Sequence, residues 1–111
     1  MAKFASDVLF SIDTGLQLKK GVNTKTITTS KVLTYQDSTV QILTNSTAGV
    51  LNCTLPAEKS GVGFWIRNQL SSASNISVNN PAASGVVLLT PGDCDYFVCD
   101  GSTWTAIIKG T

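Results

Sequence analysis

The chain has 111 residues, which suffice for a single domain with one modest hydrophobic core. Its eight Lys and Arg residues against seven Asp and Glu residues give a net charge of +1, and the basic residues are scattered, so no segment is built to attract nucleic acid or an anionic membrane. The chain contains no histidine, which excludes a Ser–His–Asp or Cys–His catalytic arrangement within it.

The first thirty residues are predicted to form an extended arm, 1–30, that leads into a β-domain, 31–111. Four apolar residues mark the arm: Phe4, Val8, Phe10 and Ile12. Val8, Phe10 and Ile12 alternate with Leu9, Ser11 and Asp13, which permits a strand that adds to the sheet edge of a partner, while the rest of the arm is polar and broken by glycine. The same alternation equally permits the first strand of the domain itself, and the sequence leaves both alternatives open.

Beyond the arm, short apolar runs recur with turn residues between them, which is typical of an all-β fold. The runs span 31–35, 39–43, 50–55, 62–68, 75–79, 86–89, 95–99 and 104–108. The segments between them are rich in Gly, Pro, Asn and Ser, and no window keeps a helical period. We therefore predict a small antiparallel β-sandwich or barrel of about eight short strands.

Strand parity assigns faces to these runs, because successive side chains of a strand point to opposite sides. Val40 and Ile42 share one face and are expected in an aliphatic core, with Gln41 on the opposite face. Phe64 is expected near the middle of the core. Trp65 falls on the other face of the same strand, where it either closes a second packed layer or meets a neighbouring subunit.

The segment PGDCDYFVCDGSTWTAIIKG, 91–110, concentrates residue types that chemistry uses. Cys94 and Cys99 lie five residues apart on one predicted strand, so their Cα atoms are separated by roughly 16 Å at about 3.3 Å per residue. A disulfide needs Cα atoms within about 7 Å. We expect reduced, core-filling cysteines, although a bridge from either one to Cys53 stays geometrically open.

Its aspartates, Asp93, Asp95 and Asp100, lack the glutamate and the spaced oxygen ligands of a calcium loop, and no histidine is present for zinc. Turn chemistry explains Asp93 after Pro91–Gly92 and Asp100 before Gly101. Asp95 is expected to be solvated at a strand start. We predict no catalytic, metal-binding or cofactor-binding residues, and a protein that is not an enzyme.

The same segment predicts a terminal hairpin that is apolar on both faces, with Tyr96 and Val98 on one side and Phe97 and Cys99 on the other. Such a hairpin is either buried between layers or pressed against another subunit. The candidate subunit-interface residues are Trp65 and Phe97.

These motifs together resemble a β-module that recurs in virion proteins of tailed bacteriophages. The matching stretches are YQDSTVQILT (35–44), TLP (54–56), GVGFWIRN (61–68), NISVN (75–79), LTPG (89–92) and FVCDGSTW (97–104). The resemblance covers about residues 35–108 and carries no catalytic residue. Because the chain begins with methionine and stops after the last predicted strand, a free-standing component is favoured over a segment of a long fibre or spike.

The resemblance implies a capsid decoration, or cement, protein that is made in the host cytoplasm and stabilises the capsid surface of the virion. It further implies a homotrimer whose N-terminal arm binds the major capsid protein, with no nucleic-acid, membrane or small-molecule partner. A tail-fibre or adaptor component is the alternative within this class. From another class, a carbohydrate-binding module would use Trp65, Tyr96 and Trp104 as a platform, but Trp104 shares the parity of Ala106 and Ile108, which argues for its burial.

Overall fold

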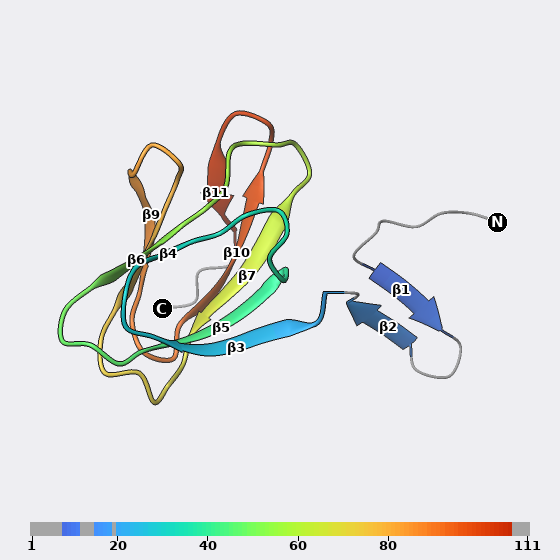
Figure 1. Cartoon of the computed structure of the whole chain (residues 1–111). Coiled ribbons are helices and arrows are strands. Elements are labelled where there is room, and N and C mark those ends of the chain that lie inside the picture. Colours follow the sequence, from blue (N-terminus) through green and yellow to red (C-terminus); the bar gives the residue numbers. More distant parts are fainter. Residues whose placement is uncertain (1–7, 12–14, 19, 108–111) are drawn as a thin grey trace.

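The computed structural model describes residues 8–11, 15–18 and 20–107, and the described residues contain strands and turns but no helix. Two sheets face each other (Figure 1). The five-stranded sheet consists, in spatial order, of β11 (Trp104–Ala106), β10 (Cys94–Cys99), β7 (Gly63–Asn68), β5 (Val40–Asn45) and β3 (Val22–Ile27). The four-stranded sheet consists of β4 (Lys31–Val32), β6 (Leu51–Thr54), β8 (Ile76–Asn79) and β9 (Gly85–Leu89). The predicted all-β class is confirmed.

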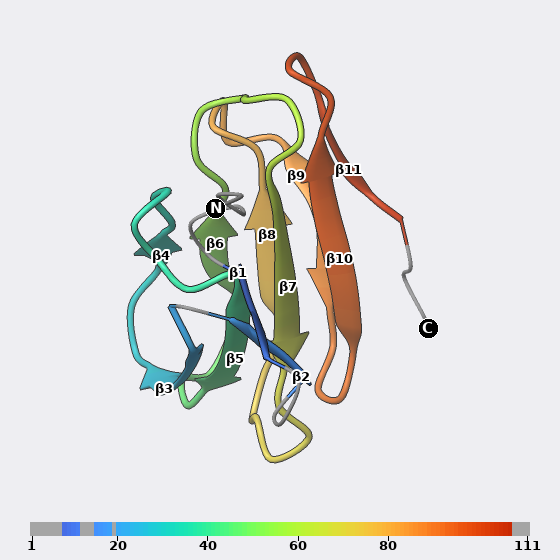
Figure 2. The same ribbon diagram turned by 90° about the vertical axis from the view of Figure 1, so that its right-hand side faces the viewer.

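The first part of the domain is wound as a flattened coil. From β3 to β8 consecutive strands alternate between the two sheets, so that β3, β5 and β7 are parallel neighbours in one sheet and β4, β6 and β8 in the other. The winding then reverses, because β9 runs antiparallel to β8 and β10 antiparallel to β7 (Figure 2). The sheets are therefore mixed, and the predicted antiparallel order is wrong.

The reason for this error is that a parallel coil and an antiparallel sandwich share the same local pattern. Both alternate side chains with a period of two and both place turns after every few residues. The two folds differ only in which strands pair with each other, and the alternation of apolar and polar residues does not reveal this pairing. Neither sheet closes on itself, so no barrel is formed by the described strands.

All eight predicted strands are present, and a ninth, β3, was missed. β3 lies within the predicted arm but forms the edge of the five-stranded sheet next to β5, so the structure places the start of the domain near residue 22 instead of residue 31. Before it, β1 (Val8–Ser11) and β2 (Gly15–Leu18) pair with each other as an antiparallel hairpin and join neither sheet. The arm is thus folded back on itself where an extended chain was predicted.

The core lies between the sheets. Its fully buried side chains include Leu33, Leu43, Leu55, Phe64, Ile66, Ile76, Val78, Leu89 and Phe97. Trp104 packs against Phe64 with ring centroids 6.2 Å apart, and its Nε1 donates a hydrogen bond to the Pro56 carbonyl oxygen at 2.9 Å. The predicted burial of Trp104 and the central place of Phe64 are confirmed.

The face assignment of β5 was wrong, because Gln41 is buried with 1% exposure while Val40 and Ile42 point outward. The Gln41 side chain is satisfied in the core: its Oε1 accepts a hydrogen bond from Asn23 Nδ2 at 2.7 Å, and its Nε2 donates to the Ser38 carbonyl at 2.8 Å. Asn23 belongs to β3, so the partner that makes this burial possible lay on the strand that the sequence did not predict.

Two buried asparagines hold the crossings between the sheets. At the end of β5, Asn45 Nδ2 donates to the carbonyls of Gly49 and Asn75 at 2.9 and 2.8 Å, and its Oδ1 accepts from the Thr47 amide. At the end of β7, Asn68 Nδ2 donates to two further loop and strand carbonyls. Each side chain therefore ties two carbonyls of neighbouring segments to the end of its strand and satisfies its own buried amide group.

We predict that Asn45→Ala lowers the free energy of unfolding by about 2–4 kcal/mol, because the buried side chain loses its hydrogen bonds to the Gly49 and Asn75 carbonyls and to the Thr47 amide. The measurement is urea denaturation of the full chain. Asn52→Ala, which truncates an exposed asparagine of β6, is the matched control and should change stability by less than about 0.5 kcal/mol. Equal effects of the two substitutions would contradict the assigned role of Asn45.

Candidate functional site

The outer face of the five-stranded sheet carries a row of apolar residues at matching register positions. Val22 of β3 pairs with Val40 of β5, Val40 with Trp65 of β7, and Trp65 with Tyr96 of β10. Ile107 continues the row, because its amide donates to the Tyr96 carbonyl at 3.0 Å. We call these five residues the outer row. They cross the whole width of the sheet on the side away from the core.

The outer row is open to solvent. Val22 is 53% exposed, Trp65 39% and Ile107 57%, although each is a large apolar residue. Trp65 and Tyr96 lie against each other with ring centroids 4.8 Å apart and planes tilted by 38°. The Tyr96 ring lies over the backbone of Gly63, where a Cβ atom would overlap the ring. The absence of a side chain at Gly63 thus lets the aromatic pair lie flat along the sheet.

A shallow hollow of about 310 Å³ adjoins the row and is lined by Val40, Ile42, Trp65, Arg67 and Cys94. Arg67 is its basic member. The Nε atom of Arg67 is hidden from solvent, and no hydrogen-bond acceptor among the described residues reaches it. A cation in an apolar hollow without a full set of acceptors is suited to an incoming carboxylate or carbonyl group.

Of the predicted interface residues, Trp65 lies on this face and Phe97 does not. Phe97 is fully buried against the core, so its assignment to a subunit interface is wrong. The physical reason is parity: Phe97 shares its buried face with Asp95 and Cys99, whereas Cys94, Tyr96 and Val98 lie on the outer face of β10. For Trp65, where two alternatives were open, no described element forms a second layer over the residue.

The structure says little about the four arm residues that were predicted to bind a partner. Val8 and Phe10 lie in β1, and Phe4 and Ile12 lie outside the described residues. Val22, Val40, Tyr96 and Arg67 were missed as members of one surface. Val22 was missed because β3 was not predicted, and Val40 because the parallel pairing of β5 with β7 leaves no mark in the sequence. Tyr96 was not aligned with Trp65 because the antiparallel pairing of β10 with β7 is equally invisible there, whereas Arg67 follows Trp65 on the same face of β7.

The aspartates of the terminal segment perform structural tasks. Asp93 Oδ2 accepts from the Thr90 amide at 3.0 Å and so closes the turn before β10. Backbone amides of Ser102 and Thr103 donate to Asp100 and lower the pKa of its carboxyl. The turn assignments are therefore confirmed, whereas Asp95, expected to be solvated, is fully buried.

No group of three His, Cys, Asp or Glu side chains within the described ranges 8–11, 15–18 and 20–107 is close enough to hold a metal ion. The three cysteines are free thiols. Burial raises the pKa of Cys53 to about 12, and burial also raises the pKa of Cys94, against the opposing effect of Arg67. Such thiols are poor nucleophiles at neutral pH, because the thiolate is the reactive form.

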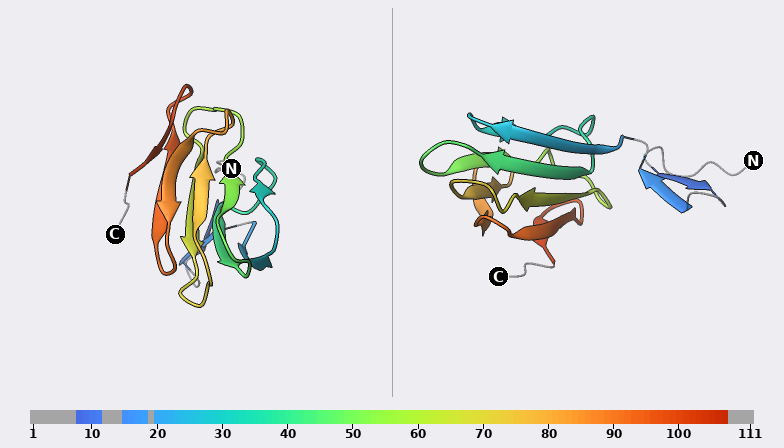
Figure 3. Two further views of the ribbon diagram at one scale, coloured as in Figure 1. Left: turned by 90° about the vertical axis from the view of Figure 1, so that its left-hand side faces the viewer. Right: turned by 90° about the horizontal axis from the view of Figure 1, so that it is seen from below.

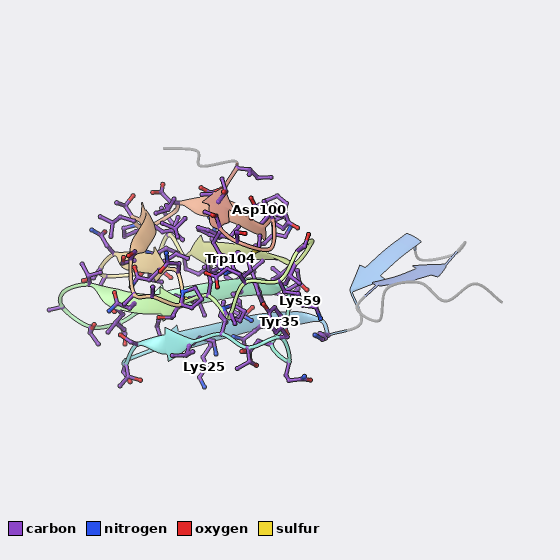
Figure 4. The ribbon with its side chains drawn as sticks, turned by 90° about the horizontal axis from the view of Figure 1, so that it is seen from above. Lys25, Tyr35, Lys59, Asp100 and Trp104 are labelled. Atoms are coloured by element: carbon purple, nitrogen blue, oxygen red, sulfur yellow. The ribbon has the colours of Figure 1, made fainter. Side chains whose placement is uncertain are left out.

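A second group of side chains, Tyr35 and Lys59, lies where the β4–β5 and β6–β7 loops meet (Figure 4). Lys59 Nζ lies 5.6 Å from the centroid of the Tyr35 ring, so the two loops that precede β5 and β7 are joined by a cation–π contact. Burial raises the pKa of the Tyr35 hydroxyl. This contact closes loops over the core, and it assembles no nucleophile with a base.

Comparison of the chain with protein-family models, with curated proteins and with solved structures gives no match. In the part of the chain that the structure describes, no helix has the length and apolar character needed to cross a membrane.

We predict that the contribution of Cys53 to stability declines at high pH. Its folded pKa of about 12 lies above the ordinary value of 9.0, so the contribution is complete below pH 9 and is lost as pH rises toward 12. The free energy difference between the wild type and Cys53→Ala should therefore shrink over this range, by at most about 4 kcal/mol. Urea denaturation at a series of pH values measures it, and parallel curves for the two proteins would refute the buried thiol as the cause.

Proposed function

We propose that this chain is a noncatalytic structural protein of a phage virion, a decoration protein that binds the outer capsid surface and stabilises the capsid lattice. In this proposal its partners are the major capsid protein and further copies of itself, arranged as a homotrimer. The outer row is the observation that supports self-association and binding to another protein. An exposed apolar strip that spans a whole sheet is typical of a surface that packs against protein.

The composition of the chain supports the same role. Only 14% of its residues are charged, which is well below the usual quarter. Trp and Tyr residues are enriched at the energetic centres of protein interfaces, and Trp65 and Tyr96 stand at the middle of the outer row. On a repeating lattice, many weak contacts between neighbouring copies act together and give firm attachment.

The virion part of the proposal is supported by the resemblance of the sequence motifs to those of phage β-modules. Seven of the motif residues that are buried in the core are Phe64, Ile66, Asn68, Ile76, Val78, Phe97 and Trp104. These residues of the matching stretches build the core, and two further residues of the same stretches, Val40 and Trp65, stand in the outer row. A tail-fibre or adaptor component would use the same surface for a different protein partner.

The carbohydrate-binding alternative receives less support. A sugar platform needs exposed, coplanar aromatic rings. Trp104 is buried, and the exposed pair Trp65 and Tyr96 is tilted by 38°. Two rings packed on each other leave a narrower flat surface than a row of separate rings.

The test is co-sedimentation of the purified chain with preformed capsids of the phage whose genome encodes it. We expect saturable binding, and we expect Trp65→Ser to weaken it by roughly 30-fold, because truncation of a central aromatic residue costs about 2 kcal/mol. Leu88→Ser is the matched control, since Leu88 is 47% exposed on the other sheet and should leave binding unchanged.

Absence of the wild-type chain from the capsid pellet, together with its recovery on tails, would replace the decoration role by the tail alternative. Absence from both would refute the virion role.

A further inference from the structure

The outer face of the five-stranded sheet carries a single positive charge. The four-stranded sheet packs on the inner face of this sheet, and the outer face points the opposite way (Figure 3). Beside the outer row, the register aligns Thr24, Ile42, Arg67 and Cys94 as a second row. Among the strand residues that the register places on this face, Arg67 is the charged one and none is acidic. The face is therefore an apolar and threonine-rich surface around one cation.

The hollow offers Arg67 no partner of its own. Its Nε atom is hidden from solvent, with no hydrogen-bond acceptor in reach among residues 8–11, 15–18 and 20–107. Gln41, which also lines the hollow, has its side-chain amide engaged by Asn23 and Ser38. Burial raises the pKa of the Cys94 thiol, so this neighbour is protonated at neutral pH and supplies no anion. Because a hidden donor without an acceptor is costly, an acceptor that enters from outside stabilises the site.

The chemistry of the hollow favours a carboxylate that is carried by a protein surface. The planar guanidinium group of Arg67 matches the two oxygens of a carboxylate, and the wall formed by Trp65 and Ile42 suits an apolar neighbour of that group. A small-molecule site encloses most of its ligand and holds it with several polar groups, whereas this hollow is shallow and has one available cation. Nucleic acids and anionic membranes are attracted by several basic residues together, which this face lacks.

A second copy that presents the same face does not meet these requirements. Two identical faces in contact form an isologous interface, in which each copy offers the other the same residues. Such a contact would enclose two Arg67 side chains and no carboxylate, and like charges across an interface are unfavourable. The complementary surface is therefore a different one.

We propose that the outer face docks on an apolar surface of a different protein, and that one carboxylate of that protein enters the hollow and pairs with Arg67. The apolar outer row then lies against the partner and excludes water around the ion pair. This inference rests on the proposed function, which names the major capsid protein as the partner, and it adds the chemical group that the partner presents.

The isolated chain allows a direct test, because Arg67 is its only arginine and gives one side-chain Nε–H resonance in nuclear magnetic resonance spectra. An isotope-labelled chain is titrated with isocaproate, a carboxylate on a leucine-like chain. We expect saturable shifts of the Arg67 Nε–H and Trp65 indole N–H resonances. The indole N–H of Trp104, which is bonded to the Pro56 carbonyl in the core, should stay in place. Isocaproamide, which lacks the charge, and sodium chloride at equal ionic strength are the controls and should cause no shift.

Co-sedimentation with capsids tests whether the partner supplies the carboxylate. Arg67→Met keeps an apolar stem and removes the charge, and we expect it to weaken capsid binding by roughly tenfold or more. Arg67→Lys keeps the charge but loses the planar fork, so its affinity should fall between those of Arg67→Met and the wild type. Lys25→Met removes an equal charge from the edge strand β3 and is the matched control that should bind like the wild type. Unchanged urea midpoints verify that the variants fold.

No shift of the Arg67 resonance, or an equal shift with isocaproamide, would overturn the carboxylate site. Equal capsid affinities of Arg67→Met and Lys25→Met would overturn the ion pair at the contact while capsid binding itself stands. Wild-type chain that stays out of the capsid pellet would instead refute the proposed function. The titration contains no capsid, so it would still decide whether the hollow takes a carboxylate.

Discussion

The domain depends on satisfying backbone carbonyls at the points where the chain crosses between its two sheets. A coil of this kind carries peptide groups past the end of the core after almost every strand, and a buried carbonyl without a donor costs about 1–3 kcal/mol. Asn45 and Asn68 contribute side-chain amides that each donate to two carbonyls of the crossing segments, beside the backbone and serine donors that reach some of the same carbonyls. With the crossings fixed, the parallel strands can align, and their register in turn determines which residues gather on the outer face.

The strands themselves could be predicted from the sequence, but not their partners. Alternation and turn residues located all eight strands from residue 31 onward, and the turns at Asp93 and Asp100 were assigned correctly. β3 was missed because VNTKTI has few apolar residues and lies at an edge, where one sheet neighbour and little core contact suffice. Gln41 was placed on the wrong face because its partner, Asn23, lies on that missed strand.

The candidate site was harder to predict than the core for a related reason. Trp65 was identified from its parity, yet its companions on β3, β5 and β10 become its neighbours only once the order and pairing of the strands are known. Core residues reveal themselves through hydrophobic alternation, whereas an exposed row reveals itself only once the sheet order is known. Phe97 shows the converse error. Both faces of its hairpin are apolar, so the sequence did not decide whether Phe97 faces the core or the outside, and the structure buries it in the core.

The first two strands of the coil, β3 and β4, also disfavour the addition of further strands at its open end. β3 and β4 are edge strands, and their free sides are where another turn of coil, from this or any other chain, would stack. β4 comprises two residues, and lysines stand on both edges, at Lys25 and Lys31. Short, charged edges of this kind discourage runaway strand addition. The open end of the coil is thereby a poor seed for a fibre, even where many copies of the chain come close together.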